Sequence, residues 1–284
     1  MNFVNVGGLN LTQIGLGTFP LKGEVLQNAM AVAINNRYGL IDTAFKYKNE
    51  TDIGEFLTQN VGIFPPVVVQ TKFSVTQLTY KKFLWYKYGR NTTKDAIEGS
   101  LKRLGKQFLD IYLLHSPSNG YVSLYGDLKE FREQQRVKVI GVCKFDEHQL
   151  QDIYDNYGEY PAINQIEVHP FYTNKPLIEF CKEHGILVEA RSIFTHGDAL
   201  TELLNSKLLI DIAERYNKTV PQIILRWIVQ QQLVAVVKSE TERHIKENAQ
   251  IFDFELSEIE MAKIDSLNKN QSFGYISTKK KTTN

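Results

Sequence analysis

The stretch Leu40–Tyr47, which reads LIDTAFKY, decides the fold, because an apolar run ends in an acid and a tyrosine follows. We interpret Leu40–Ala44 as a buried strand that carries Asp42 at its C-terminal end. Tyr47 would then lie in the loop just beyond this strand. Helix-like sequence follows at once over Glu50–Gln59. The stretch therefore predicts a strand-then-helix unit that presents two polar side chains where the strand ends.

Two later apolar runs end in a similar way. Lys72 follows the predicted strand Val67–Thr71, and His115 follows the predicted strand Leu109–Leu114. Parallel strands place their C-terminal ends at one edge of a sheet, or at one mouth of a barrel. The sequence therefore predicts that an acid, a tyrosine, a lysine and a histidine meet at one mouth.

The rest of the chain repeats the order of strand and helix. The predicted units are Gly15–Phe19 with Glu24–Asn36, Leu40–Ala44 with Glu50–Gln59, Val67–Thr71 with Thr93–Leu104, Leu109–Leu114 with Leu124–Gln134, Val137–Val142 with Glu147–Asn156, Ala162–Glu167 with Lys175–His184, Ile186–Ala190 with Leu208–Tyr216 and Val220–Gln231, and Leu233–Val237 with Thr241–Ile251. A hairpin over Phe3–Gly17 precedes them, and a last helix over Ser257–Leu267 follows them.

Eight such units imply right-handed crossovers and a closed parallel sheet. We therefore predict an α/β fold, a (β/α)8 TIM barrel with an N-terminal β-hairpin at the bottom and extra C-terminal helices. We expect one domain over residues 1–284, since composition does not change along the chain. A doubly wound sheet is the structural rival, but it would need only about five to seven strands.

Composition narrows the classes of function. The 284 residues are 43% hydrophobic and 23% charged, with a formal net charge of +1, which favours a globular protein without nucleic-acid or membrane partners. No run of about 18 apolar residues and no secretory signal are found, and Cys143 and Cys181 lack CxxC spacing. These features predict a cytoplasmic location, and we expect a monomer or weak oligomer. The 6 histidines form no HxH pair, which argues against a metal-dependent hydrolase.

The four polar residues suit proton delivery to a carbonyl oxygen. A free tyrosine has a pKa of about 10, and a nearby ammonium group lowers it by stabilising the phenolate. Lys72 can supply that charge, Asp42 can hold Lys72 in place, and His115 can donate a hydrogen bond to the substrate. No side chain supplies a hydride, so the reaction needs a cofactor. Each residue alone also has an ordinary structural explanation, such as an ion pair between Lys72 and Asp42 or packing by Tyr47.

The chain resembles the aldo-keto reductase family in the order and spacing of three segments, Ile41–Glu50, Thr71–Lys72 and Asp110–Pro117. The likeness extends from Gly15 to Leu256. The resemblance implies that the catalytic tetrad is Asp42, Tyr47, Lys72 and His115, with Tyr47 as the proton donor. It also implies a nicotinamide cofactor, usually NADPH, with NADH possible.

The resemblance also implies a set of cofactor-binding residues. Gln165 should bond the nicotinamide carboxamide, and the segments around Lys238 and Asn248 should hold the adenosine 2′-phosphate and the adenine. The full set is Gly17, Thr18, Asp42, Gln165, Arg191, Ser192, Lys238, Ser239, Arg243, His244, Glu247 and Asn248. His244 replaces an arginine that family members often carry, and Arg243 could pair with a phosphate in its place.

Two departures from the family pattern concern the nicotinamide end. Cys143 and Lys144 replace a serine and an asparagine that would bond the carboxamide, and Arg191 replaces a tyrosine that would stack on the ring. A guanidinium can stack on a flat ring, but its charge would repel the oxidised, cationic ring. One hypothesis is that Lys144 and Arg191 weaken NADP⁺ relative to NADPH. The alternatives are that both side chains turn outward or pair with acids, or that cofactor binding is degraded.

Loop position suggests the walls of the substrate pocket. The expected lining residues are Phe19, Phe45, Trp85 and His115, with Phe273 and Tyr275 from the C-terminal tail. An aromatic rim favours an apolar or sugar-like carbonyl compound of small size. The predicted function is NADPH-dependent reduction of an aldehyde or ketone to an alcohol. The alternative is a weakly catalytic or non-catalytic relative that binds the cofactor as a redox sensor or interaction subunit.

Overall fold

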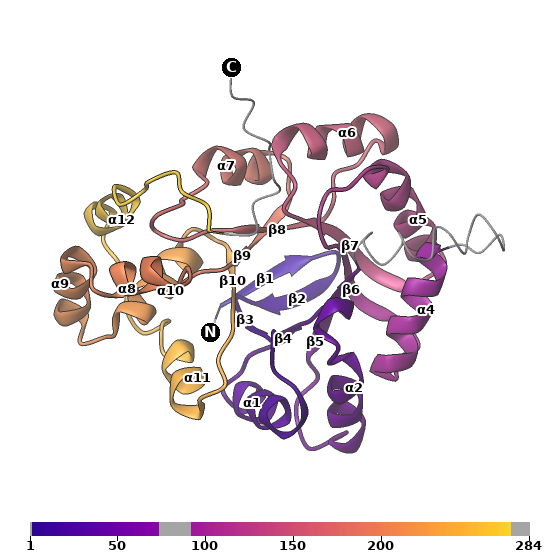
Figure 1. Cartoon of the computed structure of the whole chain (residues 1–284), viewed down its shortest axis with the longest axis horizontal. Coiled ribbons are helices and arrows are strands. Elements are labelled where there is room, and N and C mark those ends of the chain that lie inside the picture. Colours follow the sequence, from indigo (N-terminus) through magenta and orange to yellow (C-terminus); the bar gives the residue numbers. More distant parts are fainter. Residues whose placement is uncertain (1, 74–91, 274–284) are drawn as a thin grey trace.

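Eight parallel strands form a closed barrel in the computed structural model, which describes residues 2–73 and 92–273 (Figure 1). The strands, in their order around the barrel, are β10 (Val234–Val237), β3 (Ile14–Gly17), β4 (Leu40–Asp42), β5 (Val68–Phe73), β6 (Leu109–Leu114), β7 (Val137–Cys143), β8 (Ile163–Glu167) and β9 (Leu187–Arg191). The α/β barrel predicted from the alternation of strands and helices is confirmed.

Helices surround the barrel on its outside (Figure 1). Those within the described residues are α1 (Gly23–Asn35), the 3-10 turn η1 (Phe45–Tyr47), α2 (Glu50–Gln59), α4 (Thr92–Leu104), α5 (Tyr121–Glu133), α6 (Glu147–Tyr157), α7 (Lys175–Glu183), α8 (Asp198–Leu204), α9 (Lys207–Tyr216), α10 (Val220–Gln230), α11 (Glu242–Ala249) and α12 (Glu258–Asp265).

Local sequence explains where several helices begin. Asp146, Thr219 and Ser257 form capping boxes at the N-termini of α6, α10 and α12, each with the glutamine or glutamate three residues later. Close packing then fixes neighbouring helices. A Cβ on Gly54 in α2 would lie 2.6 Å from the carbonyl oxygen of Arg103 in α4, so only glycine lets these helices approach as they do.

The hairpin of β1 (Phe3–Val6) and β2 (Leu9–Thr12) closes the bottom of the barrel, as predicted. In Figure 1 it lies across the centre of the ring of strands. Its side chains Val6 and Leu11 pack in one apolar cluster with Leu40 and Val234, which are the first residues of β4 and β10. The opposite, C-terminal mouth is therefore the end left for chemistry.

Most predicted elements differ from the observed ones by one or two residues at an end, and three differences are larger or concern the site. Helix α8 was not predicted, because its seven residues are too few to show helical periodicity. Helix α5 begins at Tyr121, three residues before the predicted Leu124, since Gly120 takes a left-handed conformation and starts the turn. Strand β5 continues to Phe73, so Lys72 lies within the strand and not beyond it.

No helix in the two described ranges is long and apolar enough to cross a membrane.

Candidate active site at the C-terminal mouth of the barrel

A buried ion pair between neighbouring strands forms the base of the site. Lys72 Nζ in β5 lies 2.5 Å from Asp42 Oδ1, where β4 ends, and also donates to the carbonyl oxygen of Thr43 at 2.9 Å. The Lys72 side chain is completely buried. Burial alone would lower the pKa of Lys72, but the charge of Asp42 outweighs it and raises that pKa above its ordinary value. Lys72 therefore stays an ammonium ion at every physiological pH.

Tyr47 lies directly above this pair. It ends the single turn η1, and Lys48, in a left-handed conformation, closes that turn. Lys72 Nζ lies 5.5 Å from the centre of the Tyr47 ring, and the rings of Tyr47 and His115 meet edge to face at 5.9 Å. Burial raises the pKa of Tyr47 and the nearby Lys72 lowers it, with a net rise. The phenol thus keeps its proton, contrary to the net lowering of its pKa expected from Lys72 alone.

His115 is held as a neutral imidazole. Its backbone N–H donates to the carbonyl oxygen of Phe73 at 2.8 Å, which fixes the residue at the exit of β6. Burial lowers the pKa of His115 to about 2, and the charges of Lys72, Lys144, Lys46 and Arg191 contribute. Its buried Nδ1 has no hydrogen-bond partner within the described ranges. A neutral imidazole carries one N–H, so His115 can donate a hydrogen bond without being charged.

Two glutamines link Asp42 to a second buried carboxyl group, that of Glu189 in β9. Gln70 Nε2 donates to Asp42 Oδ1 at 2.7 Å and to Glu189 Oε2 at 2.6 Å. Gln165 Nε2 donates to the same two oxygens, at 3.1 Å and 2.8 Å. Burial raises the pKa of Glu189 to about 7, and the charge of Asp42 adds to the rise. Sequence reasoning missed Gln70 and Glu189, although each is a buried polar residue that directly follows two apolar residues of its strand.

The network orients the Gln165 side chain. Because its Nε2 is taken by two carboxyl groups, its Oε1 remains as an acceptor, and the Cys143 thiol donates to it only weakly at 3.8 Å. Thr18, by contrast, is completely buried and its hydroxyl donates to the carbonyl oxygen of Asp42 at 2.9 Å. Gly17 ends β3 beside Lys238, whose backbone nitrogen would lie 3.5 Å from a Cβ on that glycine. Thr18 therefore supports the end of β4 with its side chain.

The residues expected at the adenosine end gather around the exit of β10 and helix α11. They are Lys238, Ser239, Arg243, His244, Glu247 and Asn248. Arg243 Nη2 lies 3.3 Å from His244 Nε2, and Arg243 Nε pairs with Glu247 at 3.3 Å on an exposed surface. Lys238 pairs with Glu240 at 3.1 Å and is also exposed. Two exposed cationic side chains at a helix N-terminus suit a phosphate group.

A pocket of about 1220 Å³ opens above Tyr47 and His115. Its described lining consists of Phe19, Lys46, Tyr47, His115, Ser116, Pro117, Ser118, Asn119, Gly120, Tyr121, Lys144 and Gln149. Phe45, expected in the wall, is absent from this lining, and its ring lies 4.5 Å from the Arg103 guanidinium. Trp85 and Tyr275 lie outside the described residues. Phe273 lies beside His169, with its backbone N–H donating to Glu167 at 2.7 Å.

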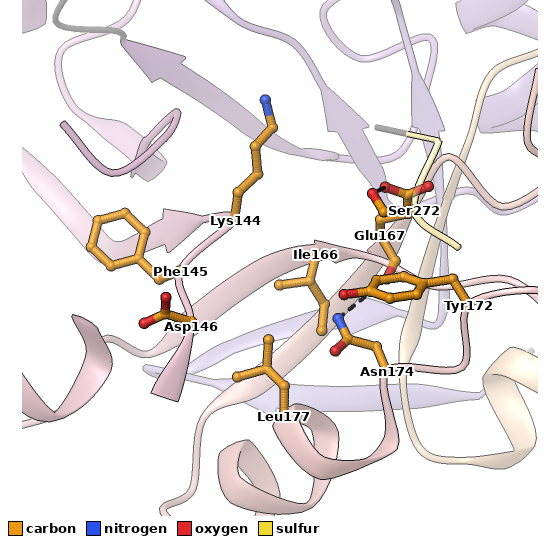
Figure 2. Close-up of a pocket in the computed structure, with 9 residues that line it drawn as sticks. All are labelled: Lys144, Phe145, Asp146, Ile166, Glu167, Tyr172, Asn174, Leu177 and Ser272. Carbon is orange, nitrogen blue, oxygen red and sulfur yellow. Dashed lines mark hydrogen bonds between the residues drawn. The ribbon is translucent and has the colours of Figure 1, made fainter. Parts of the chain in front are cut away.

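A smaller pocket of about 170 Å³ lies between the exits of β7 and β8 (Figure 2). The C-terminal segment borders it, since the hydroxyl of Ser272 donates to Glu167 Oε2 at 2.7 Å. The part of Lys144 nearest the backbone borders this pocket, while the ammonium end of its side chain extends away from Ile166 and Tyr172 (Figure 2). Arg191 donates to the hydroxyl of Ser192 at 3.1 Å. Neither Lys144 nor Arg191 forms an ion pair with an acid among the described residues.

Comparison with known proteins finds similar sequences and a similar fold. A family model described as the aldo/keto reductase family matches residues 13–269. An uncharacterized oxidoreductase, YtbE, and a glyoxal reductase, both from Bacillus subtilis, are 39% and 38% identical, and each alignment covers 94% of this chain and 92% of the relative. The crystal structure of a Bombyx mori aldo-keto reductase in complex with NADP is similar, with a TM-score of 0.83, 27% identity, and 97% and 95% of the two chains covered.

Proposed function

This chain belongs to the aldo/keto reductase family of NAD(P)H-dependent oxidoreductases, and we propose that it reduces an aldehyde or ketone to an alcohol with NADPH. The proton would come from Tyr47 and the hydride from the nicotinamide. The observation that carries the proposal is the position of Tyr47, which lies over the buried pair of Lys72 and Asp42 and against a neutral His115. A small carbonyl compound is the proposed substrate.

The residues at the mouth fit a nicotinamide dinucleotide. Gln165 Oε1 would accept a hydrogen bond from the carboxamide, since the network described above leaves this oxygen available. Lys238 and Arg243 would pair with a 2′-phosphate, which supports NADPH over NADH. The similar Bombyx mori enzyme was solved with NADP, which supports the same choice. When bound, the cofactor supplies the hydride.

Each residue of the tetrad has a proposed task. Tyr47 donates its proton to the carbonyl oxygen as negative charge develops there. Lys72 then stabilises the phenolate that remains, and Asp42 holds Lys72 in position. His115 donates a hydrogen bond to the same carbonyl oxygen and helps to orient the substrate.

Substitution of Tyr47 by Phe tests the proposal. The variant keeps the ring that packs against His115 and Phe19 but lacks the proton. We expect kcat for reduction of glyoxal and a panel of aldehydes to fall by about 100-fold or more, while NADPH binding by calorimetry stays unchanged. Tyr154→Phe is the matched control, because Tyr154 stacks on Tyr160 on the outside of the barrel. Full activity of Tyr47→Phe would refute the proposed role of the phenol.

The second candidate function is that of a redox sensor or interaction subunit. The observation that favours it is the replacement of family residues at Cys143, Lys144 and Arg191. NADPH binding with no turnover of any carbonyl compound, in both the wild type and Tyr47→Phe, would support this candidate. For either function we propose a cytoplasmic setting, which the buried free thiols of Cys143 and Cys181 favour, because thiols persist in a reducing compartment.

A further inference from the structure

Two lysines line the same pocket as the proposed catalytic groups. Lys46 precedes Tyr47 in the turn η1, and Lys144 follows the end of β7. Both belong to the lining of the 1220 Å³ pocket together with Tyr47 and His115. The described lining contains no aspartate or glutamate. The described lining of the pocket is therefore cationic.

The backbone directs Lys144 toward this pocket. Lys144 takes a left-handed conformation with φ of 68°, and its N–H donates to the carbonyl oxygen of Gln165 at 3.0 Å. Phe145, the next residue, is completely buried and packs edge to face on Tyr121. With its backbone fixed on both sides, Lys144 extends its ammonium group away from the smaller pocket (Figure 2). A left-handed conformation is uncommon for lysine, and here the backbone hydrogen bond and the buried Phe145 hold it in place.

The nearest acid in sequence does not neutralise Lys144. Asp146 accepts from the backbone N–H of Gln149 at 2.9 Å as the N-cap of α6. Lys46 is exposed and, within the described part of the chain, has no ion-pair partner. Half-buried Arg191 adds a third positive charge at the mouth.

The basic side chains at the mouth add to the effect of burial on the pKa values of Lys144 and His115. Burial lowers the pKa of Lys144, and Arg191, Lys46 and Lys72 lower it further. Lys144 and these three side chains also lower the pKa of His115, after the larger effect of burial. Like charges that line one pocket repel, and an anion bound between them would relieve that repulsion while forming charge-assisted hydrogen bonds.

We propose that the natural substrate is a small carbonyl compound that carries an anionic group, a carboxylate or a phosphate, which Lys144 and Lys46 bind. The inference rests on the proposed reductase function and names its substrate class. In the reaction, the carbonyl carbon takes a hydride from NADPH and the carbonyl oxygen takes the proton of Tyr47. The C=O bond becomes C–OH, NADPH becomes NADP⁺, solvent reprotonates Tyr47, and the anionic group is unchanged.

Matched substrate pairs test the inference. One pair is benzaldehyde and 4-carboxybenzaldehyde, and the other is glyceraldehyde and glyceraldehyde 3-phosphate. We expect kcat/KM to be at least about tenfold higher for the charged member of one pair, a ratio that shrinks as salt concentration rises. The pair that shows the preference distinguishes a carboxylate from a phosphate. A ratio of one or less in both pairs would overturn the inference.

Variants assign the preference to the lysines. Lys144→Met should reduce the charged-to-neutral ratio by about tenfold, Lys144→Arg should retain most of it, and Lys46→Met should reduce it less, because Lys46 is exposed. Lys138→Met is the matched control, since Lys138 lies on the same strand β7 but contacts Phe108 outside the pocket. An unchanged ratio in Lys144→Met and Lys46→Met would overturn the assignment.

A binding measurement separates failure of this inference from failure of the proposed function. Calorimetry with benzoate and with benzyl alcohol, on protein saturated with NADP⁺, needs no turnover. We expect benzoate to bind more tightly than benzyl alcohol, and Lys144→Met to weaken benzoate by about tenfold. Lysine-dependent benzoate binding without any reduction would refute the reductase function alone. Reduction without preference for the charged substrates, and with benzoate binding unaffected by Lys144→Met, would refute the anionic substrate alone.

Discussion

Replacing Glu189 by Gln removes one ionisable group from the centre of the barrel with little change in shape. Oε2 of this carboxyl group accepts hydrogen bonds from Gln70 and Gln165, and the carbonyl oxygen of a glutamine could accept both. The other oxygen, Oε1, is buried and has no hydrogen-bond partner among the residues that the structure describes. The substitution therefore changes charge and titration far more than packing.

The size of the expected change in unfolding free energy follows from the pKa of Glu189. Burial, with a contribution from Asp42, raises this pKa from 4.5 to about 7. At about 1.4 kcal/mol for each pH unit, this corresponds to about 3 kcal/mol of unfolding free energy. The folded protein holds the proton more tightly than the unfolded chain. The stabilisation is thus fully present below pH 4.5 and is lost as the pH rises through 7.

Urea unfolding at pH 4.5 and pH 8 measures the effect as a difference between two proteins. We expect the free energy of unfolding of Glu189→Gln, relative to the wild type, to increase by about 3 kcal/mol between these two pH values. Any free-energy cost of burying the new glutamine amide does not depend on pH, so it is the same at both pH values and cancels in this comparison. Glu55→Gln, on the exposed face of α2, is the control. A relative stability of Glu189→Gln that stays the same at both pH values, within about 0.5 kcal/mol, would refute the reasoning.

Three further outcomes are expected. Lys72→Met should lower the free energy of unfolding at pH 7 by about 3–5 kcal/mol, because the Asp42 carboxylate stays buried without its cation; an equally stable variant would contradict this. Nitrogen NMR should show a neutral His115 imidazole from pH 4 to pH 8, since the pKa of His115 is about 2; a titration near pH 6.5 would contradict it. Gly54→Ala should cost about 1–3 kcal/mol in urea unfolding, because its Cβ would lie 2.6 Å from the Arg103 carbonyl oxygen; unchanged stability would show that α2 and α4 separate freely.

The barrel could be predicted because each unit carries its own signal. A buried parallel strand is an apolar run, and the following helix shows a different period, so the alternation is visible without long-range information. Helix α8 was missed because Asp198–Leu204 is shorter than two turns and follows a loop. The ends of elements differ by one to three residues, as at Lys72 and Tyr121, because hydrogen bonding to neighbours decides where an element stops.

The site could be predicted only in part, and the reason is geometric. Asp42 and Lys72 lie on adjacent strands, and both are polar residues where apolar strands end, so their meeting follows from the fold. Gln70 and Glu189 lie on β5 and β9, which are not neighbours in the barrel, and they meet across its interior. No local pattern indicates which inward-facing side chains meet across the lumen. The direction of Lys144 was likewise open, because it depends on a left-handed backbone conformation.

The protonated state of Tyr47 before the reaction separates the proposed roles of Tyr47 and Lys72 in proton transfer. Sequence reasoning expected Lys72 to lower the pKa of Tyr47, but burial outweighs it and the phenol stays protonated. A general acid must hold its proton until the substrate needs it, so a raised pKa before reaction is no obstacle. The ammonium of Lys72 matters most for the phenolate that forms as the carbonyl oxygen takes the proton. Because Asp42 fixes Lys72 in place beforehand, this stabilisation requires no rearrangement during the reaction, and it favours the transition state over the bound substrate.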